Sequence, residues 1–199
     1  MLGLAGQLMS IPTDFLVKTG GFSDFYGSVV QSLPAVTNET LLEPIATRAA
    51  RLLCLTDEFA PLWLSMTGQE WTRDSACRLA VERREIQIQL DVLSALCLGI
   101  SVEELCTIYR TQFPVLRGYE TNDLYDANGR KVPGVINKLF RQHGESLSAE
   151  ERTWTHPQSG VEYVFEFPFQ SFDREEDMRK AYTHFEQLLA EKQIEELAK

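Results

Sequence analysis

A group of basic residues with no acidic neighbour is the part of this sequence best suited to contact with phosphate. The stretch 128–144 contains Arg130, Lys131, Lys138 and Arg141 and no aspartate or glutamate, in a chain whose formal net charge is -10. Lysine and arginine bind phosphate oxygens, and such contacts position a protein on DNA without reading its bases. These four residues are therefore candidate DNA contacts. The alternative is a solvated amphipathic helix whose basic side chains face only water.

Catalytic motifs are missing from the sequence. It contains neither of the Gly-rich patterns G-x-x-x-x-G-K-[ST] and G-x-G-x-x-G, no G-x-S-x-G nucleophile elbow and no H-E-x-x-H zinc motif. The adjacent acids at 150–151 and 175–177 stand where helices are expected to begin, and the helix dipole favours negative charge there. We read them as helix-start residues rather than as an acid/base pair, and no catalytic residue is assigned.

The cysteines and histidines show no metal-binding spacing. Cys54, Cys77, Cys97 and Cys106 form no C-x-x-C pair, and the three histidines are far apart. Cys54 and Cys97 lie in apolar runs, where a thiol behaves as a small hydrophobic group. We expect four reduced, structural cysteines, as is typical of a cytoplasmic protein, rather than disulfides or metal ligands.

The composition is that of an ordinary globular protein. Of the 199 residues, 44% are hydrophobic and 24% are charged, which is enough apolar surface for one core. No run reaches the roughly 18 apolar residues of a membrane span, and the apolar N-terminus lacks the basic segment of a secretory signal. We expect a cytoplasmic protein with no membrane partner. Its acidity argues against a free-standing DNA-binding module.

Helices are expected to position the basic residues. Apolar residues recur at helical spacing over 4–15 (with a break or kink at Pro12), 40–53, 57–68, 72–98, 102–113, 134–142 and 173–189. Gly99 is suited to end the strongest of these helices, and the capping box Ser101-x-x-Glu104 to begin the next, so that the two form a helical hairpin. Pro114 stops that second helix.

Extended segments are few. The run "SVVQSLP" at 28–34 and the alternating "VEYVFEFPF" at 161–169 are strand-like, and Asn128-Gly129 is a typical hairpin corner. The expected fold is mainly α with a small β component (α+β). It has a helical bundle-like core, a short hairpin and one or two additional strands.

The order of several short patterns resembles the C-terminal region of large bacterial adenine-specific DNA methyltransferases. In "LMSIPTDFLVKTGGFSDFYGSVVQSLPAV", a helix leads to a charged, Gly-containing turn and then to a strand ending in "LP". The residues that match are Asp14, Phe15, Lys18, Gly20, Gly21, Leu33 and Pro34. The helical stretch 40–100, "LCTIYRTQFPVLRGYE" and "LYDANGRKV" resemble the tail of phage-defence methyltransferases of the phage growth limitation and DISARM kinds. The resemblance spans roughly 5–134.

The resemblance implies a role without catalysis. Those enzymes bind S-adenosylmethionine through a Gly-containing loop and hold the target adenine with N-P-P-[YF], and neither motif is present here. The cofactor would belong to the parent enzyme, and this chain would bind none. The resemblance places Lys18, Gly20 and Gly21 near double-stranded DNA, although a solvated turn is an equal alternative. We expect three parts: the end of a target-recognition-like segment at 1–38, a helical domain at 39–118, and a hairpin, short strand and C-terminal helix at 119–199 that pack on the helical domain.

Two functions follow as expectations. The first is the C-terminal, non-catalytic part of a site-specific adenine-N6 DNA methyltransferase, which positions target DNA and supports an N-terminal methyltransferase domain. The second is an acidic helical interaction module of a phage-defence or restriction system, without DNA contact, whose last amphipathic helix (173–199) docks to another protein. A small hydrolase is a third class that no motif favours.

Overall fold

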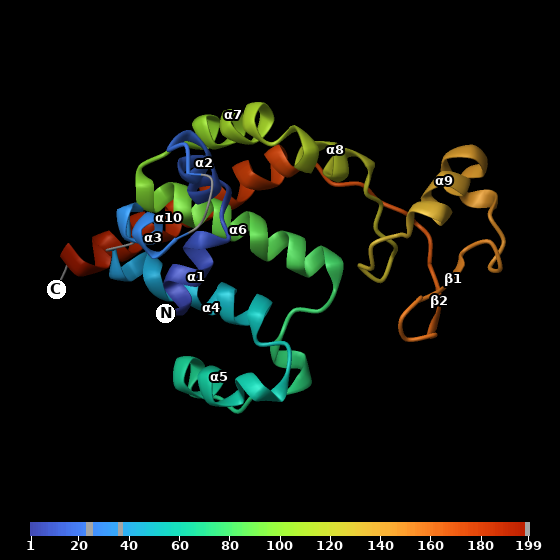
Figure 1. Ribbon diagram of the computed structural model, residues 1–199, viewed down its shortest axis with the longest axis horizontal. Coiled ribbons are helices and arrows are strands. Elements are labelled where there is room, and N and C mark those ends of the chain that lie inside the picture. Colours follow the sequence, from blue (N-terminus) through green and yellow to red (C-terminus); the bar gives the residue numbers. More distant parts are fainter. Residues whose placement is uncertain (23–25, 36–37, 198–199) are drawn as a thin grey trace.

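The computed structural model describes residues 1–22, 26–35 and 38–197 and is mainly α-helical with one two-stranded antiparallel sheet (Figure 1). The helices are α1 Leu2–Leu8, α2 Ile11–Thr19, α3 Gly27–Ser32, α4 Glu39–Leu53, α5 Ala60–Thr67, α6 Ala80–Leu98, α7 Val102–Gln112, α8 Pro114–Asn122, α9 Gly134–His143 and α10 Arg174–Leu197; the strands are β1 Thr153–Thr155 and β2 Glu162–Val164. The predicted fold class is confirmed. No helix of the described chain combines the length and apolarity needed to cross a bilayer.

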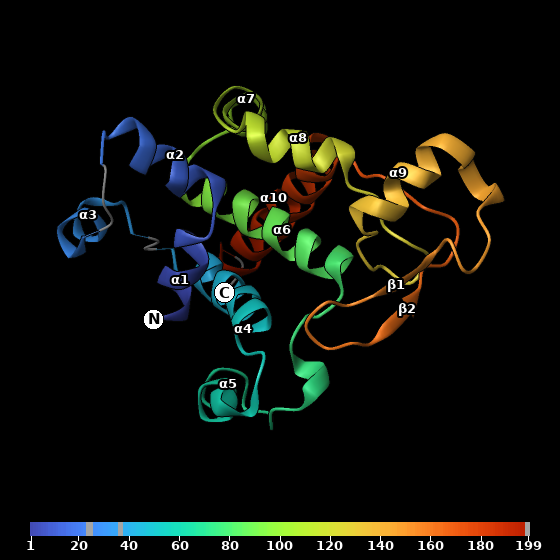
Figure 2. The ribbon, with the colours of Figure 1, turned by 45° about the vertical axis from the view of Figure 1, so that its right-hand side comes forward.

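Helix α6 is the centre of the largest hydrophobic core. It packs against α4 on one side and α10 on another, and α2 and α7 also contact it (Figure 2). Its residues Ile88, Leu90, Val92 and Leu93 are almost fully buried. A helix with apolar residues on most of its circumference is stable only when several neighbours cover it, and these helices do so. We refer to α1, α2, α4, α6, α7 and α10 as the body.

The ends of α6 and the start of α7 follow local rules. Gly99 ends α6 with φ +67, a left-handed conformation that glycine adopts without steric cost. Ser101 and Glu104 form the predicted capping box, in which the backbone N–H of Ser101 donates to Glu104 Oε2 at 2.8 Å. The predicted helical hairpin of α6 and α7 is therefore present. Helix α6 begins at Ala80 and not near 72, because Thr72 caps a short 3-10 turn and Ala76 and Leu79 are extended.

Two predictions about the first forty residues are wrong. Pro12 does not break a helix: it lies in the first turn of α2, where its missing N–H is harmless, and the chain bends at Met9 and Ser10 instead. The run "SVVQSLP" is not a strand, because 27–32 form α3 and Val30 N–H donates back to Tyr26 O at 3.2 Å. A strand needs a neighbour to satisfy its backbone, and among the described residues this segment has none.

Residues 123–172 form a small side unit attached to the body. Its core is Val132, Ile136, Phe165 and Phe169. The predicted corner is present: Gly129 has φ +76, and the flanks of the turn pair through a single bridge between Tyr125 and Lys131. The predicted strand 161–169 is much shorter than expected, since only β2 pairs, with β1. Figure 1 shows this unit at the far end of α8 from the body.

Helix α10 returns from the side unit to the body. Met178 and Phe185 are buried in the main core, and Tyr182 and Leu189 pack against it, as the helical pattern of these four residues predicted. The hydroxyl of Tyr182 donates to Ile100 O at 3.2 Å. The apolar face that we expected to dock to a partner protein is therefore covered by α6 and α7 of the same chain.

Candidate nucleic-acid interface

Helix α8 connects the two groups of predicted DNA contacts. At its start, Lys18 Nζ lies 3.8 Å from the centre of the Phe113 ring. At its end, Arg141 Nη2 donates to Asn122 Oδ1 at 2.9 Å. Nine residues of α-helix, about 13 Å, separate these ends. The sequence patterns did not predict α8, because Pro114 was read as a stop and is also the first residue of the next helix.

The N-terminal group consists of Lys18, Gly20 and Gly21. Lys18 is half exposed and pairs with Asp14, one helical turn earlier, at 2.9 Å, so part of its charge is neutralised. Gly20 caps α2, and Gly21 has φ +70 with nothing within 4 Å of a Cβ placed on it. Backbone conformation alone accounts for glycine at position 21. Lys18 is the only member of this group whose side chain can approach phosphate.

Arg130 and Lys131 are both paired with acids that precede them. Arg130 donates to Asp126 Oδ2 through Nε at 2.9 Å and Nη2 at 2.5 Å, and also to Val164 O at 2.6 Å. These bonds join the turn to β2. Lys131 Nζ lies 2.6 Å from Asp123 Oδ2 and is half exposed. The acid-free stretch therefore begins with two cations that the fold already neutralises.

Asp126 is the centre of this turn. Its side chain is fully buried and accepts the N–H groups of Asn128 (3.1 Å) and Arg130 (2.8 Å) in addition to the guanidinium. Burial alone would favour the protonated acid, but Arg130 and the backbone donors outweigh it, so the pKa of Asp126 lies below its ordinary value. Arg130 is therefore a structural residue of the side unit.

Helix α9 turns its basic residues outward. Ile136 is buried and Phe140 packs inward, whereas Lys138 and Arg141 are exposed on the opposite side. Arg141 is held by the neutral groups of Asn137 and Asn122. In the described part of the chain, neither Lys138 nor Arg141 forms an ion pair. Of the seven predicted contacts, these two therefore have no acid paired with them in the described structure, and both lie on the exposed side of α9.

The outer side of α8 carries an exposed apolar pair. Val115 and Tyr119, one turn apart, are 69% and 63% exposed, while Leu116 and Glu120 face inward. Sequence reasoning missed both residues. The signal was the spacing within "PVLRGYE", because residues four apart lie on one face of a helix. Val115 and Tyr119 form one such pair, and Leu116 and Glu120 form the next.

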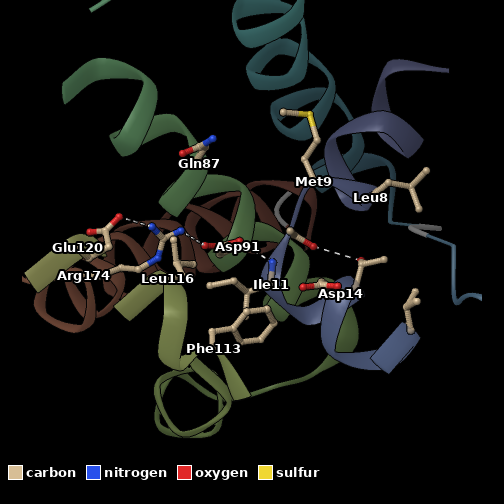
Figure 3. A pocket seen from close by; sticks show the side chains of 13 residues that line it. Leu8, Met9, Ile11, Asp14, Gln87, Asp91, Phe113, Leu116, Glu120 and Arg174 are labelled. Carbon is tan, nitrogen blue, oxygen red and sulfur yellow. Dashed lines mark hydrogen bonds and ion pairs between the residues drawn. The ribbon is translucent and has the colours of Figure 1, made fainter. Parts of the chain in front are cut away.

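The inner side of α8 is fixed by a buried ion-pair network, and Figure 3 shows its part around Asp91, Glu120 and Arg174. Arg174 donates to Asp91 Oδ2 at 2.7 Å and to Glu120 Oε1 at 2.8 Å. The network continues to Arg84, which donates to Glu120 Oε2 at 2.8 Å and to Asp177 Oδ2 at 2.7 Å. Three helices, α6, α8 and α10, are joined in this way. Asp91 also accepts the N–H of Ile11 at 2.7 Å, which adds the start of α2.

Burial and the paired charges act against each other in this network. Burial raises the pKa of Asp91 above its ordinary value, although Arg174 and the Ile11 N–H lower it. Burial lowers the pKa of Arg174, but Asp91 and Glu120 outweigh burial, so the pKa of the guanidinium is raised. Arg174 Nε and Arg84 Nη2 are buried and have no hydrogen-bond partner among the described residues. The network therefore joins α6, α8 and α10 while two of its buried donors stay unpaired within the described ranges.

A cleft of about 660 Å³ lies between α2, α6 and α8, over this network. Its polar floor is Asp91, Glu120 and Arg174, and its rim includes Asp14 and Gln87 (Figure 3). The carboxylates of the floor are already satisfied by arginines. Across the described residues, no group of three His, Cys, Asp or Glu side chains could hold a metal ion, and the four cysteines are free.

Comparisons with known proteins place the chain in no family. No family model matches it, and no match was found among the curated proteins or the solved structures.

Proposed function

We propose that this chain is a non-catalytic helical module that positions double-stranded DNA for a site-specific adenine-N6 DNA methyltransferase. The observation that carries the proposal is the outward face of α9, where Lys138 and Arg141 keep their charge in a protein of net charge -10. Lys18 and Lys131 are half exposed but already paired with Asp14 and Asp123, so the proposal rests on the two residues of α9. Such side chains fix the register of a duplex through its phosphates.

The sequence resemblance to methyltransferase C-terminal regions supports the rest of the proposal. It covers roughly 5–134, which includes α8 and the Asn128-Gly129 turn. Since the chain lacks both a motif for S-adenosylmethionine and the adenine-binding motif, methyl transfer would belong to an N-terminal methyltransferase domain or to a separate subunit of a cytoplasmic defence system. That partner would bind the cofactor, and this chain would supply DNA contact and support.

A salt titration tests the proposal. The full chain is titrated with a labelled duplex at low and moderate salt, and the slope of log K against log salt is compared with that of Lys138→Ala/Arg141→Ala. Each phosphate contact contributes about 0.9 to the slope, so the double variant is expected to lower it by about two. The matched control is Arg73→Ala/Lys192→Ala, which removes the same charge from exposed positions elsewhere. Binding that is equal in both double variants would contradict the proposal.

The alternative, an interaction module without DNA contact, was based on the acidic balance of the chain and on its last amphipathic helix. The acidic balance still favours it, whereas Met178 and Phe185 on the apolar face of that helix are buried in the body. A partner protein would have to bind another surface. Retention of duplex binding by the isolated chain favours the DNA module, and its complete absence favours the alternative.

A further inference from the structure

We propose that the junction of α8 and α9 binds an unpaired stretch of DNA, with Tyr119 as a stacking surface for a base and with Arg141 and Lys138 on the flanking phosphates. The inference deepens the proposed function and rests on it, because it names the form of DNA that this surface holds. We define the junction surface as Val115, Tyr119, Asn122, Lys138 and Arg141.

Tyr119 is available for such a contact. Its side chain is 63% exposed, and in the described structure its hydroxyl forms no hydrogen bond. Val115 lies one turn earlier on the same face and is also exposed. A single exposed aromatic residue needs no special explanation. What distinguishes Tyr119 is that Arg141 is bonded to the last residue of the same helix, Asn122.

Arg141 is held at the C-terminal end of α8 through Asn122. Asn122 is the last residue of α8, three positions after Tyr119, and it accepts hydrogen bonds from Arg141 Nη2 at 2.9 Å and from Asn137 Nδ2 at 2.7 Å. Arg141 Nε donates to Asn137 Oδ1 at 3.1 Å, so the guanidinium is restrained by two amides that leave its charge intact. Lys138, one turn before Arg141 on α9, is also exposed.

The surface is also rigidly supported. Glu120 follows Tyr119 and points inward to Arg84 and Arg174, and these bonds fix the rotation of α8 about its axis. Tyr119 is therefore presented outward on an element whose inner side is locked into the body. A surface that is already formed loses little entropy when it binds.

The combination favours unpaired DNA over duplex. An aromatic ring beside a few cations is the usual arrangement in single-strand binding, where every base offers a face for stacking and the cations follow the backbone. In a duplex the bases are stacked on each other, and a ring on the outside of a helix reaches none of their faces.

Fluorescence anisotropy with a labelled oligodeoxythymidylate of about 16 nucleotides tests the inference on the full chain. Loss of one stacked base is expected to weaken the binding of Tyr119→Ala about tenfold, whereas Tyr119→Phe and Tyr119→Trp keep affinity close to that of the wild type. Tyr26→Ala is the matched control, since Tyr26 is 66% exposed and lies before α3. Urea unfolding of each variant confirms an intact fold.

The outcomes separate this inference from the function on which it rests. Single-strand binding that is unchanged in Tyr119→Ala, or weakened equally in Tyr26→Ala, overturns the stacking role. If duplex binding still depends on Lys138 and Arg141 in that case, the proposed function stands without the inference. If the chain binds neither the oligodeoxythymidylate nor a duplex of the same length, both fail. Single-strand binding that is lost on Tyr119→Ala, together with duplex binding that depends on Lys138 and Arg141, supports both.

Discussion

The body and the side unit both depend on a buried carboxylate that is bonded to arginine, but they use it differently. In the body, Asp91 and Glu120 bind Arg174, so that the bonds connect residues 83 and 54 positions apart. In the side unit, Asp126 binds Arg130, four positions later, and closes a single turn. The first arrangement fixes how distant helices pack. The second fixes local chain direction and attaches the turn to β2.

The body and the side unit both support the junction of α8 and α9. Glu120 locks α8 from inside, while Asp126 shapes the turn that leads into α9. The junction of these helices carries the exposed residues of the proposed DNA contact. Loss of the body network is expected to affect the whole fold, because three helices meet there. Loss of the Asp126 turn should affect mainly the side unit.

The largest expected effect comes from Arg174→Ala. The substitution leaves Asp91, which is 1% exposed, without its partner charge. Removing one member of a buried pair costs about 3–5 kcal/mol, because the remaining charge is buried without compensation. The measurement is the free energy of unfolding from urea denaturation. Arg174→Lys is the control. Its free energy of unfolding should lie between those of the wild type and Arg174→Ala, since lysine restores the charge but not the simultaneous bonds to Asp91 and Glu120. A cost under about 1 kcal/mol in Arg174→Ala would contradict a supporting role for the network.

Asp126→Ala should have a smaller effect, confined to the side unit. It removes an acceptor for the backbone N–H groups of Asn128, Arg130 and Glu166 and for the Arg130 guanidinium, and unsatisfied buried donors cost about 1–3 kcal/mol. Hydrogen exchange is the measurement: amides around 125–132 should lose protection, while those of α6 retain it. Equal loss of protection in both regions would show that the side unit is not a separate cooperative element.

Local elements could be predicted from the sequence, and long-range contacts could not. The capping box Ser101–Glu104, the end of α6 at Gly99 and the turn at Gly129 depend on neighbouring residues, and all three are present. The failures at 28–34 and at α8 arise where packing decides: a β-branched run had no strand to pair with, and α8 has Gly118 in its interior and no buried residue.

The candidate interface shows the same division. Residue types indicated four cations at 128–144, but the spacing could not show that Asp123 and Asp126 neutralise two of them. Likewise, Glu120 and Arg174 are 54 residues apart in the sequence, and their pairing depends on α10 packing against the body. Once α8 is known to be a helix, periodicity is sufficient to place Tyr119 on its outer face.

Acid should weaken the side unit before the body. The pKa of Asp126 is lowered in the folded state, so its contribution to stability is complete above the unfolded value of about 3.9 and is lost as the pH falls through the lower, folded value. The pKa of Asp91 is raised, which has the opposite sign: folding is favoured on its account at low pH, and this contribution is lost as the pH rises through the folded pKa.

Hydrogen exchange between about pH 3 and 5 measures this difference. Protection at 125–132 should decrease on acidification while that of α6 changes less, and Asp126→Asn should show no such dependence in this range. A loss of protection that is the same in both regions, or that persists in Asp126→Asn, would contradict the assignment to Asp126.

The smallest expected effect is that of Arg179→Ala, and it isolates burial as the cause of the difference. Arg179 lies five residues after Arg174 on the same helix and also binds a carboxylate with two nitrogens, at 3.1 and 3.0 Å from Glu103. Its side chain is 41% exposed and that of Glu103 is 70% exposed, so both are hydrated when the pair is broken. Exposed pairs contribute little for this reason. The urea midpoint of Arg179→Ala should match that of the wild type at moderate salt. A loss comparable to that of Arg174→Ala would mean that the joining of α7 to α10 at the surface, and not the buried network, holds α10 in place.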